Sequence, residues 1–367
     1  MNIIVNKQML VEAVGNVSRA VSSKNTLAAL EGVLMKAKEG RLYLTGYDLE
    51  LAISTSIEAR VQQEGEIVLS AKLFLDMIRR MPSEEISITT DEKYLTVIKG
   101  SMTEYTILGI PAAEYPELPS VSQTTNIALN QSTLKNMINQ TLFAVAVSDA
   151  KPVHTGSLFD VKGGELNVVS VDGYRLALRR EKVSFEQDMM FIVPGKSLSE
   201  VSKLLKDEDS PIEISVSKRH IIFQVGEYQI ISRLLEGEFL DYKAAIPSGA
   251  ATTVKIGARD LINAIDRASL LISDNIKSPL RLNFSDGLIK ISCSTAIGKA
   301  YDEITCNQTG DGVEIGFNSR YMLDALKASE CDEIQMVING PLSPIKIVPL
   351  EGDAFTFLVL PVRLKAE

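Results

Sequence analysis

The sequence lacks the residues on which several classes of protein depend. It has no tryptophan, only two histidines (His154 and His220) and three cysteines, Cys293, Cys306 and Cys331, without CxxC spacing. An odd number of cysteines in a long chain argues against a disulfide framework, and their spacing argues against a zinc site. Histidine-based catalysis or metal binding is equally disfavoured. We therefore expect neither a metal nor another cofactor.

Long hydrophobic runs are also missing. The longest uncharged apolar stretch, residues 136–148, is too short to span a bilayer. Lys7 and Glu12 interrupt the N-terminal region before any signal-like apolar run. These absences predict a cytoplasmic protein without a membrane partner, and the 367 residues predict two or three domains.

The chain contains an internal repeat. Residues 2–10 read NIIVNKQML, residues 126–134 read NIALNQSTL and residues 253–261 read TVKIGARDL. In each segment, alternating apolar residues lead into a helix. Small polar residues at 119–125 and 247–253 separate the copies. The repeat predicts three homologous domains at residues 1–120, 126–247 and 253–367.

A second series of repeats lies within these domains. Residues 67–76 (IVLSAKLFLD), 192–200 (IVPGKSLSE) and 315–324 (IGFNSRYMLD) again run from strand into helix. Three charged positions recur in register: Lys72, Lys196 and Arg320; Asp76, Glu200 and Asp324; Arg79, Lys203 and Lys327. Alternating strands follow, with hairpin turns at Glu39-Gly40, Gly163-Gly164 and Asp286-Gly287. We predict an α+β fold in which each domain is a doubled strand–helix–strands unit.

The positions of the charged residues say more about possible partners than the net charge does. A net charge of −9 by itself argues against a nucleic-acid partner. The predicted helices, however, carry fourteen Lys and Arg against six Asp and Glu; they are residues 7–24, 71–81, 131–146, 196–206, 258–272 and 319–328. Residues seven apart share a helix face, so the repeated cations line one face, with Leu73, Met77, Leu198, Val201 and Leu205 predicted on the buried faces. Each helix alone could simply be a solvated amphipathic helix. Together they favour a basic surface for a polyanion, held by its phosphates and not by base sequence.

These features resemble the bacterial DNA sliding clamps, the beta subunits of DNA polymerase III, over the whole chain. The local matches are residues 171–177 (VDGYRLA), 237–242 (GEFLDY), 315–318 (IGFN) and 360–364 (LPVRL). The resemblance implies a DNA clamp fold in which two head-to-tail copies close a ring, with helices inside and sheets outside. It implies a processivity factor that encircles duplex DNA without sequence specificity, and no catalytic residues. The implied partners are the replicative polymerase catalytic subunit, the clamp loader, other proteins with clamp-binding motifs, and a second copy of the chain.

The resemblance and the charge pattern also assign candidate residues. The DNA-facing set is Lys24, Lys72, Arg79, Arg80, Lys135, Lys196, Lys203, Arg320 and Lys327. The dimer interface would include Tyr105, Leu271 and Ile272. The pocket for an apolar partner peptide would comprise His154, Val171, Gly173, Tyr174, Arg175, Leu176, Leu240, Ala245, Asn318, Tyr321, Leu342, Leu358, Leu360, Pro361, Val362 and Arg363. Residues 357–364 are predicted to form one strand, with Arg175 and Arg363 at the edge of the groove. His154 and Leu240 depart from the family, which has leucine and proline there.

Two other classes of function remain open from the sequence. An enzyme would need a catalytic constellation, yet no P-loop, Rossmann fingerprint or marked carboxylate pair occurs. A ring-shaped or solenoid-like interaction scaffold that does not bind DNA would share the repeat but not the use of the basic helices. Retention on circular but not linear DNA separates this scaffold from a clamp.

Overall fold

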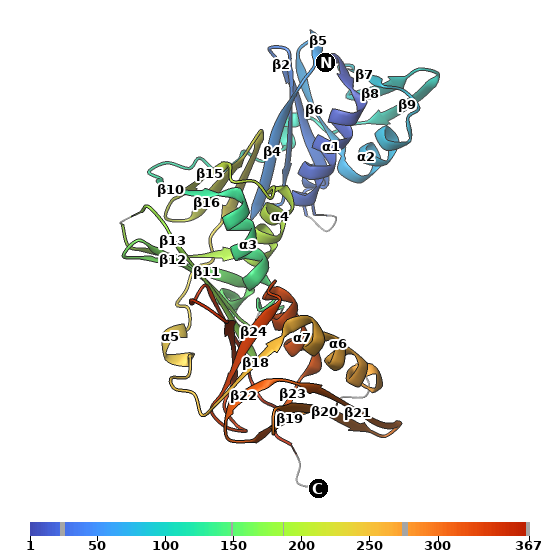
Figure 1. Cartoon of the computed structure of the whole chain (residues 1–367). Coiled ribbons are helices and arrows are strands. Elements are labelled where there is room, and N and C mark those ends of the chain that lie inside the picture. Colours follow the sequence, from blue (N-terminus) through green and yellow to red (C-terminus); the bar gives the residue numbers. More distant parts are fainter. Residues whose placement is uncertain (23–25, 148–149, 186, 274–277, 365–367) are drawn as a thin grey trace. The chain divides into compact units, whose positions relative to one another are not determined.

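The structure, a computed structural model, describes residues 1–22, 26–147, 150–185, 187–273 and 278–364 (Figure 1). The chain forms two compact units. The first comprises residues 1–130, 203–205 and 210–234, and the second comprises residues 131–202, 206–209 and 235–367.

All six predicted helices are present. They are α1 (Lys7–Val17), α2 (Ala71–Arg80), α3 (Gln131–Leu142), α4 (Gly195–Leu204), α6 (Ala258–Ala268) and α7 (Ser319–Ala328). The predictions for 7–24 and 258–272 were too long, because 3-10 turns at Ser18–Ala20 and Ser269–Leu271 follow α1 and α6. The prediction for 131–146 was too long because α3 ends at Leu142. A short helix, α5 (Tyr242–Ala245), was not predicted. Among the described residues, no helix has the length and apolar character needed to cross a membrane.

Side-chain caps explain where two of these helices begin. The Asn6 side chain accepts a hydrogen bond from the backbone N–H of Met9 at the start of α1. Asn318 does the same for Arg320 and Tyr321 at the start of α7. These bonds satisfy backbone donors that the first helical turn leaves without partners.

The first unit contains two antiparallel sheets. The five-stranded sheet has the order β5-β1-β7-β8-β9, and the eight-stranded sheet has the order β10-β15-β16-β17-β4-β3-β2-β6. Their strands are β1 (Asn2–Asn6), β2 (Gly32–Lys38), β3 (Arg41–Tyr47), β4 (Leu51–Glu58), β5 (Arg60–Gln63), β6 (Gly65–Ser70), β7 (Glu85–Thr90), β8 (Leu95–Gly100), β9 (Thr103–Leu108), β10 (Thr125–Asn130), β15 (Pro211–Val216), β16 (His220–Val225) and β17 (Tyr228–Arg233). Helices α1 and α2 lie side by side in this unit (Figure 1).

The second unit has a nine-stranded sheet, β14-β11-β12-β13-β26-β25-β24-β18-β22, and a four-stranded sheet, β21-β20-β19-β23. The strands are β11 (Gly156–Lys162), β12 (Glu165–Val171), β13 (Arg175–Lys182), β14 (Met189–Pro194), β18 (Thr252–Gly257), β19 (Leu280–Ser285), β20 (Leu288–Thr295), β21 (Gly298–Thr305), β22 (Asn307–Gly310), β23 (Val313–Phe317), β24 (Glu333–Ile338), β25 (Ile345–Pro349) and β26 (Phe355–Val359). Helices α6 and α7 pack together in this unit.

The three predicted hairpin turns are confirmed. Glu39-Gly40 joins β2 to β3, Gly163-Gly164 joins β11 to β12, and Asp286-Gly287 joins β19 to β20. Both central residues have positive φ in each turn, for example 50° and 75° at Glu39 and Gly40. This conformation matches the twist of the flanking strands, which is why the same sequence signal recurs in all three copies.

The buried helix faces are largely as predicted, with one error. Leu198, Val201 and Leu205 are buried. On α2, however, Leu73 is exposed and Met77 is only half-buried, while Phe74 and Ile78 form the buried face. Phe74 and Ile78 stand four residues apart and therefore lie on the same side of the helix.

Two strand pairings join segments that the sequence assigns to different domains. In the first unit, β4 pairs with β17, placing Ile53 opposite Ile230. In the second unit, β13 pairs with β26, placing Leu176 opposite Leu358. The sheets thus continue across both predicted domain junctions, which the sequence repeat did not reveal.

Candidate functional site

The basic helix residues are mostly exposed. Lys72, Arg79 and Arg80 on α2 are exposed, while Ala71, Phe74 and Ile78 are buried. Lys196 and Lys203 on α4 are exposed, as are Arg320 and Lys327 on α7. Each pair stands seven residues apart, so each of these helices presents a cationic face opposite its apolar face.

Several other helix cations are held by neighbouring groups. Lys135 is half-buried and lies 2.8 Å from a carboxylate oxygen of Asp207. Lys7 donates a hydrogen bond to the backbone carbonyl of Met81, and Arg267 pairs with Asp302 at 2.7 Å. Lys24 lies outside the described residues. The cations on α2, α4 and α7 are candidates for a polyanion surface because their side chains are exposed.

The predicted peptide pocket has a buried apolar floor. Val171 on β12 pairs with Leu176 on β13, which in turn pairs with Leu358 on β26. All three are buried in one cluster, together with Leu158, Val169, Leu178, Ile192 and Tyr242. The pairing across three strands supplies a continuous apolar row, and Tyr242 brings α5 against it.

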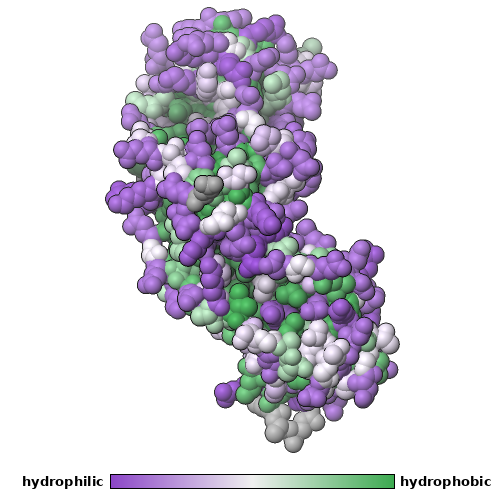
Figure 2. All heavy atoms as spheres, turned by 60° about the vertical axis from the view of Figure 1, so that its left-hand side comes forward, coloured by the Kyte–Doolittle hydropathy of each residue, from purple (hydrophilic) through white to green (hydrophobic). Residues whose placement is uncertain are grey.

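The remaining predicted pocket residues differ in their burial. His154, Arg175, Tyr321 and Pro361 are partly buried. Gly173, Tyr174, Leu240, Ala245, Asn318, Leu342, Leu360, Val362 and Arg363 are exposed. Figure 2 shows apolar patches among mostly hydrophilic atoms on the face of the molecule that it presents.

The C-terminal segment differs from the predicted continuous strand. Strand β26 ends at Val359, and Leu360 then donates its N–H to the Tyr174 carbonyl at 2.9 Å. Val362 donates its N–H to Gly316 of β23, in the other sheet, at 2.8 Å. The segment leaves one sheet for the other, and therefore Leu360 and Val362 stay exposed while Leu358 is buried.

Arg175 does not lie at the edge of the groove as predicted. Its side chain is only 11% exposed and pairs with both Asp172 and Asp324. Of the two arginines expected to attract an acidic peptide, only Arg363 is exposed.

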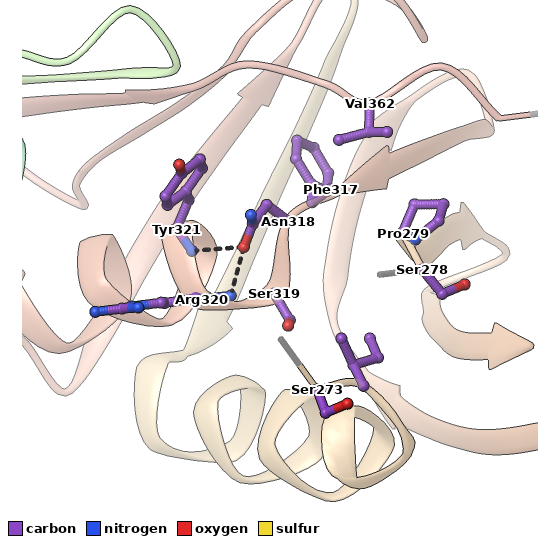
Figure 3. Close-up of a pocket in the computed structure, with 10 residues that line it drawn as sticks. Ser273, Ser278, Pro279, Phe317, Asn318, Ser319, Arg320, Tyr321 and Val362 are labelled. Atoms are coloured by element: carbon purple, nitrogen blue, oxygen red, sulfur yellow. Dashed lines mark hydrogen bonds between the residues drawn. The ribbon is translucent and has the colours of Figure 1, made fainter. Parts of the chain in front are cut away.

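A cavity of about 650 Å³ lies at the start of α7 (Figure 3). Asn318, Tyr321 and Val362, all predicted for the peptide pocket, line it together with Phe317, Pro279 and Arg320. Ile272, predicted for the dimer interface, lines it as well. The cavity therefore connects residues from two separately predicted sites.

The three predicted interface residues are half-buried. Tyr105 lies on β9, which ends the five-stranded sheet. Leu271 and Ile272 pack partly against the core of the second unit, whereas the neighbouring Leu270 is 82% exposed and was not predicted. Leu270, Leu271 and Ile272 thus form a short apolar run whose first side chain is exposed and whose next two are half-buried.

Sequence reasoning also missed Phe239. Its ring lies 5.4 Å from the ring of His154, in an edge-to-face arrangement, and packs against the apolar floor. Residues 237–242 were noted only as a family match, because no periodicity marks a loop residue as buried. Among the described residues, no group of three or more His, Cys, Asp or Glu side chains could hold a metal ion.

Comparison with known proteins identifies the family. Three family models match in sequence: the N-terminal domain of the DNA polymerase III beta subunit at residues 1–119, the central domain at 128–241 and the C-terminal domain at 243–363. A beta sliding clamp of Staphylococcus epidermidis is 34% identical, over 99% of both chains.

Solved structures agree. The sliding clamp of Bacillus subtilis superposes with a TM-score of 0.95 at 33% identity, covering all of both chains. The DNA polymerase III beta subunit of Pseudomonas aeruginosa superposes with a TM-score of 0.92 at 28% identity, covering 99% of this chain and 100% of that one. The chain belongs to the DNA polymerase III beta subunit family. It is a sliding clamp of the DNA clamp fold, a processivity factor that partners DNA and DNA polymerase and is not itself an enzyme.

The two histidines provide a direct test of the groove's geometry. Burial, and secondarily the nearby Lys151 charge, lowers the pKa of His154, and burial followed by Arg233 and Arg219 lowers that of His220. Truncating Phe239→Ala should raise the pKa of His154 towards its ordinary value of about 6.5 and leave that of His220 unchanged. Titration by NMR with labelled histidine measures both.

The same shifts set the direction of a pH effect on stability. Below a pH of about 6.5 the unfolded chain takes up protons that the folded chain does not, so the free energy of unfolding should fall as the pH falls.

For the titration experiment, an unchanged pKa of His154 in the Phe239→Ala variant would contradict the packing of Phe239 against His154.

Proposed function

We propose that two copies of this chain form a head-to-tail ring around duplex DNA in the cytoplasm. The groove floored by Val171, Leu176 and Leu358 receives apolar peptides of the replicative polymerase, the clamp loader and other partners. Helices α2, α4 and α7 face the DNA. The domains run over 1–120, 126–247 and 253–367, a division supported by family models that match similar, though not identical, ranges.

The observation that carries the proposal is a pair of strand edges. By the repeat, β4, β13 and β21 are equivalent strands, and β17, β26 and β9 are equivalent strands. Two of the three corresponding pairings are made within the chain, β4 with β17 and β13 with β26. In the described part of the chain, β21 and β9 each pair on one side only. A second copy can supply the third pairing, and this contact closes when each copy donates both edges.

The repeat also gives the register of this contact. Ile53 lies opposite Ile230, and Ala177 lies opposite Phe357. Ala177 also lies opposite Ser170 of β12, and Ala300 of β21 lies opposite Cys293 at the equivalent place in the third copy. Ala300 therefore corresponds to Ala177, and we expect it opposite Tyr105 of a second copy. Lys299 would then point to the other face of the sheet, since side chains alternate along a strand.

Cysteine cross-linking tests the ring. The double variant Tyr105→Cys with Ala300→Cys should form a covalent dimer on mild oxidation, because directly opposed Cβ atoms lie about 4.5–5.5 Å apart. The matched control, Tyr105→Cys with Lys299→Cys, should cross-link poorly. Denaturing electrophoresis without reductant measures both.

Replacement of the apolar contacts tests the same assembly without a cross-link. Changing Leu271 and Ile272 to Ala should shift the solution mass at low concentration towards the 40.1 kDa monomer, with circular dichroism confirming the fold. Cross-linking at both 299 and 300 alike, or a double-alanine variant that stays wholly dimeric, would refute the proposed contact.

Charge reversal tests the DNA-facing helices. Lys72→Glu, Lys196→Glu and Arg320→Glu together should reduce clamp loading and residence on nicked circular DNA, because the inner phosphates would meet negative charge. The fold and the dimer should persist, since all three side chains are exposed. Wild-type binding to linear DNA should be weak and strongly salt-dependent.

A matched control reverses three exposed lysines on strands instead: Lys36 on β2, Lys162 on β11 and Lys255 on β18. This variant has the same net charge as the helix variant and should load normally. Equal residence of the two variants on DNA would mean that α2, α4 and α7 do not face the duplex.

Shortening the side chain of Leu360 tests the proposed groove. Leu360 is 40% exposed, so Leu360→Ala should cost little stability but weaken binding of a polymerase-derived apolar peptide by about 1–3 kcal/mol. Deleting residues 361–367 should abolish binding. Met190→Ala, another exposed apolar truncation, serves as the control. Calorimetry measures all variants, and equal affinities would place the partner site elsewhere.

A further inference from the structure

Arg175 connects two segments that are distant in sequence. Its Nε lies 2.9 Å from a carboxylate oxygen of Asp172, three residues earlier. Its Nη1 lies 2.6 Å from a carboxylate oxygen of Asp324 on α7. Two carboxylates thus form ion pairs with one guanidinium group, and the planar guanidinium is well suited to directional pairing.

Two aromatic rings complete the surroundings of this guanidinium. The Arg175 Cζ atom lies 4.5 Å from the centre of the Tyr321 ring and 5.5 Å from that of Phe143. Tyr321 in turn stacks on Tyr174, with ring centres 5.8 Å apart and planes inclined by 28°. Arg175 therefore fixes a group of side chains that includes two predicted walls of the groove.

The internal repeat shows that Asp324 and Asp76, the equivalent acid of the first copy, have different partners. Asp324 occupies the position of Asp76 and Glu200 in the earlier copies. Asp76 is 41% exposed and approaches only Arg80 of its own helix, at 4.0 Å, among the contacts that the structure gives it. In the third copy, the acid at this position reaches β13 instead.

The turn that carries Arg175 is itself held by Asp172. One oxygen of Asp172 accepts hydrogen bonds from the backbone N–H groups of Tyr174 and Arg175. The Tyr174 carbonyl then accepts the N–H of Leu360. The turn, α7 and the C-terminal segment are consequently linked through one connected set of polar contacts.

We infer that the Asp172–Arg175–Asp324 bridge positions the walls of the partner groove. It holds α7 against the turn before β13, so that Tyr321 and Tyr174 stand at a fixed separation from Leu360. It also occupies the guanidinium, so the groove here accepts an apolar side chain and not an acidic one. Arg175 is thus a positioning residue, an inference that rests on the proposed peptide groove.

A paired substitution in the repeat tests this role. Asp324→Asn should weaken the binding of a fluorescein-labelled polymerase-derived peptide about tenfold, because the largely buried Arg175 guanidinium would lose one of its two charged partners. Asp324→Glu should restore much of the affinity. Asp76→Asn removes one negative charge at the equivalent position on α2, as Asp324→Asn does on α7, and it should leave peptide affinity unchanged.

Hydrogen exchange of the dimer without peptide gives a second, independent measurement. In Asp324→Asn, exchange should accelerate in segments 172–176 and 319–326 and not in residues 1–120. Unchanged exchange in both segments would overturn the inference, as would unchanged peptide affinity alongside full binding by the wild type. If the wild type itself fails to bind the peptide, the proposed groove is wrong and the positioning role falls with it, whatever the exchange result.

Discussion

Pairing of strand edges is the constraint on which the rest of this structure depends. A strand at the end of a sheet presents unpaired N–H and C=O groups, and these are costly to leave without partners. Here β17 satisfies the edge of β4 and β26 satisfies the edge of β13. The sheets therefore grow across the repeat boundaries, and the same rule applied to β9 and β21 leads to a second copy.

The pairing of β13 with β26 also brings together the residues of the proposed groove. It sets Leu176 beside Leu358 and brings the chain end past Tyr174, where backbone hydrogen bonding holds Leu360. Apolar residues alone would bind apolar side chains without a preferred orientation. The polar bridge through Arg175 adds directional contacts to Asp172 and Asp324.

The distribution of charge solves a separate physical problem. An acidic protein is repelled by nucleic acid over most of its surface, which limits non-specific association. In the proposed ring, exposed cations on α2, α4 and α7 would supply the attraction to the phosphates. Meanwhile Lys135 and Arg267 are neutralised by Asp207 and Asp302, so not every helix cation contributes to that surface.

The sequence by itself determined the repeat, the six helices, the hairpin turns and the clamp family. These follow from local signals: periodicity, paired residues with positive φ such as Asp286-Gly287, and charges recurring at Lys72, Lys196 and Arg320. It failed for Leu73, since two apolar neighbours on α2 compete for one buried face and only packing decides between them.

Only the tertiary structure decided which residues of the groove meet and in what role. Arg175 was expected at a solvated edge, but Asp324, far away in sequence, reaches it across the packed strands. The segment after Val359 was expected to extend its strand, yet its next hydrogen bonds go to Tyr174 and then to Gly316 in another sheet. Such partners depend on long-range pairing, and no local pattern in the sequence records a contact between residues this distant.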